Sequence, residues 1–245
     1  MHDSPGWQRA GALTAEHRER LLVSGVDADI LGGLELRAVA GPLPSWWHEY
    51  GNALYLHEGI EPPAKLIEHL TTYPFRDCLI VLASSMESMR ALMVGGDEAT
   101  IFVGPHSWFV KSEMYCGPGS QIVLDGHVVA TGQATVDARN GGAVIAGYGQ
   151  LWAAYTYIAT DDMHRVEDVT TGARVNPYGA TIRLGKHVWL GRDSIVTGHV
   201  EIGDGSIVGM RSLVRGQKVP ARTAVAGTPA RVIRENVTWH GDDTP

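Results

Sequence analysis

The chain has 245 residues, of which 44% are hydrophobic and 19% charged, and its formal net charge is −7. This apolar content supports a packed core, whereas the acidic balance argues against nucleic acid or an anionic membrane surface as the main partner. No apolar run approaches the length of a membrane span, and the start of the chain lacks the basic and apolar pattern of a secretory signal. We therefore expect a soluble, cytoplasmic protein.

The N-terminal part, residues 1–50, is predicted to be a cap segment that packs across one end of the main domain. Thr14 is a suitable N-cap for a short helix that ends before Gly25. Trp46 and Trp47 are expected to anchor the segment by burial. Beyond it, strand-like pieces at residues 53–58, 78–82 and 90–94 alternate with proline and turn residues.

A loose repeat with a period of about six residues begins at Val103. Val103, Leu124 and Ile145 are 21 residues apart, which corresponds to three hexads plus a three-residue corner. On this spacing we expect the following side chains to point inward: Val103, Phe109, Tyr115, Leu124, Ala130, Val136, Ile145, Leu151 and Tyr157.

A strict repeat of six residues runs from Leu184 to Val219. An aliphatic residue stands first in every hexad: Leu184, Leu190, Val196, Ile202, Val208 and Val214. Such a period matches neither a helix nor a simple strand alternation, and it is typical of a parallel β-solenoid whose coils must stack to bury their apolar positions. The sequence thus predicts a mainly β protein, with a solenoid domain over residues 51–235 and a C-terminal tail at 236–245.

The repeat is interrupted by a polar insertion, which we expect to form a protruding loop over residues 159–181. It contains His164, flanked by Asp161, Asp162, Glu167 and Asp168. Histidine titrates near neutral pH and is suited to take a proton from a nucleophile, and a nearby carboxylate can orient it. The structural alternative is an inert surface insertion.

The C-terminal hexads are basic within an acidic chain. Residues 183–234 contain nine Lys or Arg and three Asp or Glu. This excess fits a phosphorylated cofactor, because guanidinium and ammonium groups bind phosphate. A solvated basic face is the alternative interpretation.

Metal chemistry and disulfides are not expected. The chain has two cysteines, Cys78 and Cys116, whose spacing matches no zinc motif, and Cys116 is read as a packed small residue. His187 and His199 are two hexads apart and therefore on different corners of a triangular coil, so they cannot share a metal within one subunit.

Three stretches together resemble a known family: TDDMHRVEDVTTGARVNP at 160–177, IRLGKHVWLG at 182–191 and VAGTPARVIRENVTW at 225–239. They are similar to the hexapeptide-repeat acyltransferases, and more narrowly to the O-acetyltransferases of bacterial capsule and exopolysaccharide synthesis. The resemblance implies a left-handed coil, a homotrimer, and acetyl-coenzyme A (acetyl-CoA) bound between neighbouring solenoids.

The same resemblance implies roles for individual residues. His164 would be the general base, and Asp162 and Trp189 would contact the acceptor. The residues implied for the cofactor are Gly191, Gly209 and Met210 beside the pantetheine arm and Ala226, Gly227 and Arg231 near the nucleotide. Met210 departs from the small residue that the family often has there, which changes the shape of the thioester pocket.

The function that follows from the resemblance is acetyl-CoA-dependent O-acetylation of a sugar, glycan or glycoconjugate hydroxyl. A sugar-nucleotide N-acetyltransferase on the same fold remains an alternative, because an amine acceptor needs the same base and cofactor. A non-enzymatic trimeric scaffold is a further alternative, and a zinc-dependent enzyme is the least favoured.

Overall fold

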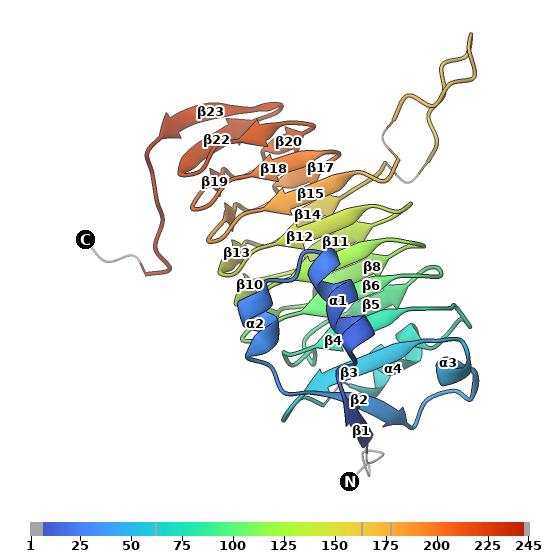
Figure 1. The fold of residues 1–245 in the computed structure, drawn as a ribbon. Helices are drawn as coiled ribbons and strands as arrows, with labels where there is room; N and C mark the ends of the chain where they lie inside the picture. Colours follow the sequence, from blue (N-terminus) through green and yellow to red (C-terminus); the bar gives the residue numbers. More distant parts are fainter. Residues whose placement is uncertain (1–6, 62, 163, 177, 243–245) are drawn as a thin grey trace.

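The computed structural model describes residues 7–61, 63–162, 164–176 and 178–242. Its strands wind into a parallel solenoid with three long sheets, and the coils stack from the N-terminal end to the C-terminal end (Figure 1). The chain passes from sheet A to sheet C to sheet B and back, so each complete coil has an A–C, a C–B and a B–A corner. The expected mainly β solenoid is confirmed.

Each sheet runs along the solenoid, and each of its strands is hydrogen-bonded to the strands that come before and after it in the order below. Sheet A contains β1 (Gln8–Ala12), β2 (Leu36–Gly41), β3 (Ala53–His57), β4 (Leu79–Leu82), β6 (Thr100–Val103), β9 (Gln121–Leu124), β12 (Ala143–Ala146), β15 (Thr181–Leu184), β18 (Val200–Ile202) and β21 (Lys218–Val219). Sheet B contains β20 (Leu213–Arg215), β17 (Ile195–Thr197), β14 (Thr156–Ala159), β11 (Ala134–Ala138), β8 (Glu113–Cys116) and β5 (Ala91–Val94). Sheet C contains β23 (Ala230–Glu235), β22 (Thr223–Gly227), β19 (Ile207–Val208), β16 (Trp189–Leu190), β13 (Gln150–Trp152), β10 (Val128–Ala130) and β7 (Trp108–Phe109).

The first position of each C-terminal hexad points into the core, as predicted. All six aliphatic residues, Leu184, Leu190, Val196, Ile202, Val208 and Val214, are at most 3% exposed. In the parallel register Leu190 pairs with Val208, and Val196 pairs with Val214. Equivalent side chains of successive coils therefore stack on one another and exclude water along the axis.

The predicted register of the earlier coils is partly wrong. Four residues lie between Ala130 and Thr135, one more than between their partners Phe109 and Glu113 in the preceding coil, so Glu113 pairs with Thr135, 22 residues away. A shift of one residue turns a strand side chain to the opposite face. The inward positions are therefore Met114, Ala146, Trp152 and Ile158, whereas the predicted Tyr115, Leu151 and Tyr157 point outward and Ile145 packs beneath the N-terminal helices.

The N-terminal segment covers the outer face of sheet A. Helix α1 (Ala15–Val23) begins at Thr14, whose hydroxyl accepts the His17 N–H at 3.1 Å, as predicted for an N-cap. Helix α2 (Ala28–Gly32) follows, and both helices lie along sheet A (Figure 1). Leu21 and Leu31 from these helices are in one buried cluster with Phe102 and Val123 from the sheet. Helices α1 and α2 thus pack on sheet A and not on the outer faces of sheets B and C.

Two further helices lie near the N-terminal end of the solenoid. Helix α3 (Trp46–Glu49) carries Trp47, which is 2% exposed and anchors the segment as expected. Helix α4 (Ala64–Leu70) was not predicted, because it falls in a proline-rich stretch that the pattern assigns to a turn. None of the described helices is long and apolar enough to cross a membrane.

The polar insertion leaves the solenoid at a B–A corner. Strand β14 ends at Ala159 and β15 begins at Thr181, and the segment between them projects away from the stacked coils (Figure 1). We call residues 160–180 the arm. Its base is buried at Thr160, Asp161, Asn176 and Ala180, whereas the described residues from 164 to 173 are exposed.

Candidate functional site

The base of the arm is held by a network around Asp161, whose side chain is 1% exposed. Arg174 donates to this carboxylate at 3.1 Å and Asn176 at 3.3 Å. The Asn140 amide, from the preceding B–A corner, donates to the same group. A buried carboxylate is stable only with such partners, so this network fixes the direction in which the arm leaves the solenoid.

The outer part of the arm is a narrow hairpin. Glu167 and Arg174 form an antiparallel bridge, and Asp168 accepts backbone N–H groups from Thr170 and Thr171 at 2.9 and 2.8 Å. These hydrogen bonds hold the pKa of Asp168 below its usual range. The hairpin is thus a locally specified structure rather than an irregular insertion.

The predicted base, His164, lies exposed on the arm just beyond the Asp161 network. Its backbone carbonyl accepts the Asn176 amide at 2.8 Å, which ties this part of the backbone to the arm's other strand. The side chain therefore faces solvent from an anchored stretch of backbone, where an acceptor molecule can approach it.

The four carboxylates around His164 bind other partners in the described structure. Asp162 pairs with Arg215 at 3.3 Å, and Glu167 pairs with Arg165. Asp161 and Asp168 are engaged as described above. Within the described residues none of the four is hydrogen-bonded to the His164 imidazole. Their observed role is to shape the arm and its base.

The residues predicted to line the cofactor gather at the C–B corner of the C-terminal coils. The Gly191 N–H donates to Val208 at 2.8 Å, and the Gly209 N–H donates to Val225 at 2.8 Å, which stacks one corner on the next. A Cβ atom at Gly191 would lie 2.7 Å from the Met210 nitrogen, so coil stacking itself requires glycine there. No side chain therefore projects from the corner at Gly191 or at Gly209.

The other cofactor candidates continue this corner. Met210 is 65% exposed and stands directly after Gly209. Ala226 and Gly227 occupy the next coil, and Arg231 on β23 pairs with Ala226 in the antiparallel register. Five of the six candidates thus form one column along the solenoid edge, with Arg231 on the strand beside it. The structure brings this group together.

Trp189 lies on the adjoining outer face of sheet C and is 36% exposed. It stands in a ladder of outward residues between Leu151 and Ile207. Trp239, from the C-terminal tail, lies 6.2 Å away between ring centroids and stacks on His187 at 3.9 Å. Reciprocal hydrogen bonds between His187 and Trp239, at 2.9 and 3.0 Å, fix the tail there.

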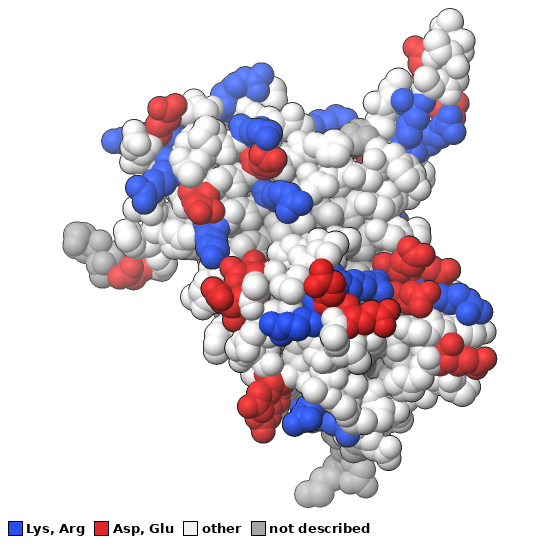
Figure 2. All heavy atoms as spheres, in the orientation of Figure 1, with Lys and Arg blue, Asp and Glu red and all other residues white. Residues whose placement is uncertain are grey.

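The basic residues of the C-terminal coils do not form one face, contrary to the interpretation as a single cofactor surface. Figure 2 shows Lys and Arg around the C-terminal coils with acidic groups between them. Lys218 pairs with Glu201 on sheet A at 2.7 Å, and Lys186 pairs with Asp27 of the N-terminal segment at 3.2 Å. Arg192 and Arg211 flank the glycine column, where they share Asp193. Only part of the charge is therefore near the candidate site.

The cysteines are buried, as predicted for Cys116. Burial raises the pKa of the Cys78 thiol to about 11 and raises that of Cys116 further. A thiol of such a pKa is a poor nucleophile at neutral pH. Among the described residues there is no group of three or more His, Cys, Asp or Glu side chains arranged to hold a metal ion.

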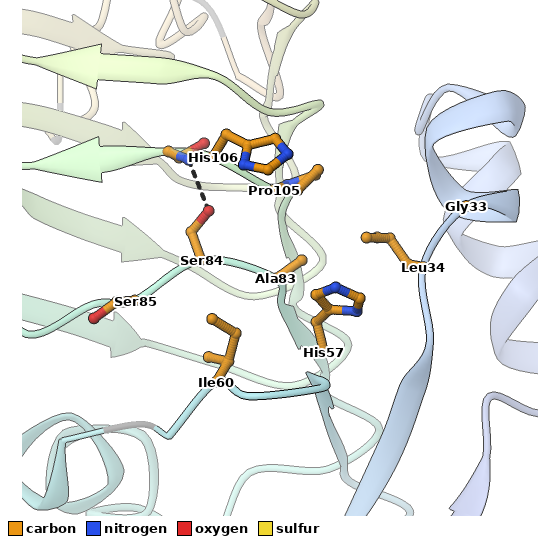
Figure 3. A pocket seen from close by; sticks show the side chains of 10 residues that line it. Gly33, Leu34, His57, Ile60, Ala83, Ser84, Ser85, Pro105 and His106 are labelled. Carbon is orange, nitrogen blue, oxygen red and sulfur yellow. Dashed lines mark hydrogen bonds between the residues drawn. The ribbon is translucent and has the colours of Figure 1, made fainter.

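A cavity of about 420 Å³ that the sequence did not indicate lies at an A–C corner of the first coils (Figure 3). His57, His106 and Leu34 stand around it. Its Ser84 hydroxyl is engaged by backbone groups, since it donates to Gly104 at 2.7 Å and accepts from Ser107 at 2.8 Å. The cavity is on a different edge from the arm and shares no residue with the candidates above.

The predicted site residues lie on opposite sides of the solenoid. His164 and Asp162 are on the arm at the B–A corner, whereas Trp189 is on sheet C, the side of the triangle that faces away from this corner. The glycine column is at the C–B corner. A single copy of the chain therefore does not assemble the complete set of predicted site residues.

Comparison with known proteins agrees with this architecture. No family model matches the chain. The chain is 40% identical over 58 residues to the galactoside O-acetyltransferase of Escherichia coli K12, a match that covers 24% of this chain and 28% of that protein. It is 46% identical over 56 residues to the putative colanic acid biosynthesis acetyltransferase WcaF of E. coli K12, covering 23% and 30%. The matches thus span less than a third of these curated relatives.

Solved structures extend the likeness to the fold. The polysialic acid-specific acetyltransferase NeuO superimposes with a TM-score of 0.63 at 23% identity, over 69% of this chain and 77% of NeuO. The polysialic acid O-acetyltransferase OatWY gives 0.50 at 20% identity, over 64% and 83%. The solenoid thus has the fold of the left-handed β-helix acetyltransferases. The expected resemblance to hexapeptide-repeat acetyltransferases is confirmed in fold and, over a short stretch, in sequence.

Proposed function

We propose that the chain is an O-acetyltransferase that uses acetyl-CoA as acyl donor and a sugar or glycan hydroxyl as acceptor. The observation that carries this proposal is the anchored arm, which presents His164 at the edge of a solenoid with the acetyltransferase fold. The short matches to sugar and polysaccharide acetyltransferases support the choice of acceptor class.

We further propose that the protein is a homotrimer whose active sites lie between copies. The arm and Trp189 are on opposite sides of the solenoid, so they belong to one site only if two copies contribute. The outer faces of sheets B and C expose large apolar side chains, including Trp108 at 56% and Ile195 at 40%, whereas helices cover sheet A. Exposed apolar surface of this kind marks a contact region.

The acyl donor would lie along the C–B corner. Gly191, Gly209 and Ala226 have a small side chain or none and so leave space for the pantetheine arm. Met210 would lie beside the thioester, and Gly227 and Arg231 would lie near the nucleotide. Arg192 and Arg211 flank this edge, and their side chains are 58% and 79% exposed, so they are accessible to phosphate oxygens. Acetyl-CoA supplies the activated acetyl group.

In the proposed reaction His164 takes the proton from the acceptor hydroxyl while its oxygen attacks the thioester carbonyl. A backbone N–H stabilises the negative charge that develops on the carbonyl oxygen. The carbon–sulfur bond then breaks, and His164 returns the proton to the thiolate. Trp189 and Asp162 would position the acceptor, and holding both reactants together lowers the entropic barrier.

The test is an acetyl-transfer assay that measures free thiol release with a panel of glycans and amino sugars. We expect hydroxyl acetylation by the wild type and a loss of at least about 100-fold in His164→Ala, the size expected when a general base is removed. His48→Ala, which removes an exposed histidine from helix α3 in the N-terminal segment, is the control. Transfer to amines alone would favour N-acetylation, and wild-type turnover in His164→Ala would refute the assigned base.

A further inference from the structure

A second cavity lies on the same edge of the solenoid as the arm, on coils that precede it. Its volume is about 420 Å³, within the range of small-molecule sites. We call it the aromatic pocket and define it by Tyr73, Phe75, Tyr115, Arg139 and Asn140. None of these residues is among the catalytic or cofactor candidates described above.

Aromatic side chains from two separate segments line the pocket. Tyr73 and Phe75, from the connection between α4 and β4, have ring centroids 5.8 Å apart. Tyr115 comes from the outer face of sheet B. Tyr73 is 56% exposed, so its ring is accessible to a ligand. The three rings offer flat apolar faces, and the two tyrosines add hydroxyl groups, of which that of Tyr115 donates to Glu113.

Arg139 supplies the pocket's hydrogen-bond donors. Its Nε donates to Asp137 at 2.5 Å, and the centre of its guanidinium group is 5.9 Å from the Tyr115 ring. Asp137 is the one side chain of the described structure that accepts a hydrogen bond from this guanidinium. Since the fork carries five N–H donors, most of them remain for a ligand.

The charges around the pocket cancel. Arg139 is paired with Asp137, and Arg90 is paired with Glu113 at 3.2 Å, whose carboxylate also accepts the Tyr115 hydroxyl at 3.1 Å. The pocket therefore has no net charge to attract a polyanion. It is suited to a ligand with apolar faces and several uncharged hydroxyl groups.

Asn140 connects the pocket to the arm. It lines the pocket and also donates its amide N–H to Asp161 at the arm's base. The pocket therefore adjoins the network around Asp161, which positions His164. A ligand chain seated in the pocket would extend along the solenoid edge toward the arm.

We propose that the aromatic pocket binds a pyranose unit of an uncharged acceptor glycan, remote from the hydroxyl that is acetylated. The sugar's C–H faces pack on the aromatic rings, and its hydroxyl groups accept from Arg139. This inference rests on the proposed glycan acetylation and extends it, because it specifies a neutral, oligomeric acceptor and a site that holds it before transfer.

Binding is measured by isothermal titration with maltohexaose, laminarihexaose and chitohexaose, and with an α2,8-linked sialic acid hexamer as the charged comparison. We expect the wild type to bind at least one neutral hexamer more tightly than the sialic acid hexamer. Tyr73→Ala should weaken that binding by about tenfold, the contribution of one stacked aromatic side chain. Arg139→Lys should weaken it as well, because lysine keeps the charge beside Asp137 but lacks the forked donors.

Tyr148→Ala is the matched control, since Tyr148 is a 39% exposed tyrosine that packs beside His127 at an A–C corner. It should bind like the wild type. The proposal is overturned if none of the neutral hexamers binds, if the sialic acid hexamer binds best, or if Tyr73→Ala binds unchanged. Because titration needs no acetyl-CoA, failure of acetyl transfer with intact hexamer binding would refute the proposed function and leave the pocket standing.

Discussion

Arg174 Nη2 lies 3.1 Å from Asp161 Oδ2, and this ion pair joins the two strands of the arm where they leave the solenoid. The Asp161 side chain is 1% exposed and that of Arg174 is 21% exposed, so the pair is shielded from solvent. Removing one partner of a buried pair leaves an uncompensated group and costs about 3–5 kcal/mol. The direction of the arm, and with it the place of His164, depends on this contact.

Asp161→Asn should therefore loosen the arm while the solenoid stays folded. We expect faster amide hydrogen exchange over residues 164–176 and a fall in acetyl transfer of about tenfold or more, because misplacement of a catalytic group is costly. Glu167→Gln is the control, since the Glu167 pair with Arg165 is exposed and contributes little. Equal exchange rates in the two variants would contradict the anchoring role of Asp161.

Trp189→Ala should mainly affect the acceptor. The Trp189 ring is on the outer face of sheet C beside Trp239, so its loss removes contact surface without opening the core. We expect a higher acceptor KM and an unchanged thermal shift on addition of coenzyme A. Tyr148→Ala changes an exposed aromatic residue at an A–C corner, away from the outer faces of sheets B and C, and is the control. An unchanged acceptor profile in Trp189→Ala would count against its pocket role.

Asp125 should make stability depend on pH. It is 5% exposed, and burial raises the pKa of its carboxyl to about 6, although the Asp27 N–H donates to it at 3.0 Å. Because the folded-state pKa lies above the ordinary value near 3.9, ionisation opposes folding, and this contribution to stability is lost as pH rises from about 4 to about 6.

Asp125→Asn removes the ionisation and retains an acceptor for the Asp27 N–H. At pH 8 the variant should be more stable than the wild type, by on the order of 2 kcal/mol, and below pH 4 the two should converge. Urea unfolding at both pH values measures this difference. A variant that is less stable at pH 8, or equally more stable at both values, would show that Asp125 does not titrate as described.

The solenoid was predictable because its periodicity is local. Each hexad repeats the same requirement, an inward aliphatic residue such as Leu190 or Val208, and all six predicted positions are buried. The register of the earlier coils was not predictable with equal accuracy. The corner between Phe109 and Glu113 is one residue shorter than the corner between Ala130 and Thr135, and Tyr115 and Met114 both fit the core until the pairing is known.

The candidate site was predicted in its parts but not in its arrangement. His164 was predicted because it lies in the insertion that interrupts the hexad repeat, and the glycines were predicted because they occupy fixed positions within that repeat. The contact of Asp161 with Arg174 spans 13 residues and follows no sequence period, and the contact with Asn140 spans 21 residues, the spacing of one coil, but joins two polar corner residues that the apolar pattern does not select. Trp239 likewise reaches His187 across 52 residues, and nothing in the tail's sequence indicated where it would pack.

In the proposed trimer His164 and Trp189 serve one active site from two copies of the chain. The most direct test mixes His164→Ala with Trp189→Ala, dissociates and reassociates the mixture, and measures acetyl transfer. If neighbouring copies share a site, random reassembly restores both residues in roughly a quarter of the sites, and activity should rise well above that of either variant alone. Activity no greater than the mean of the two separate variants would contradict a shared site.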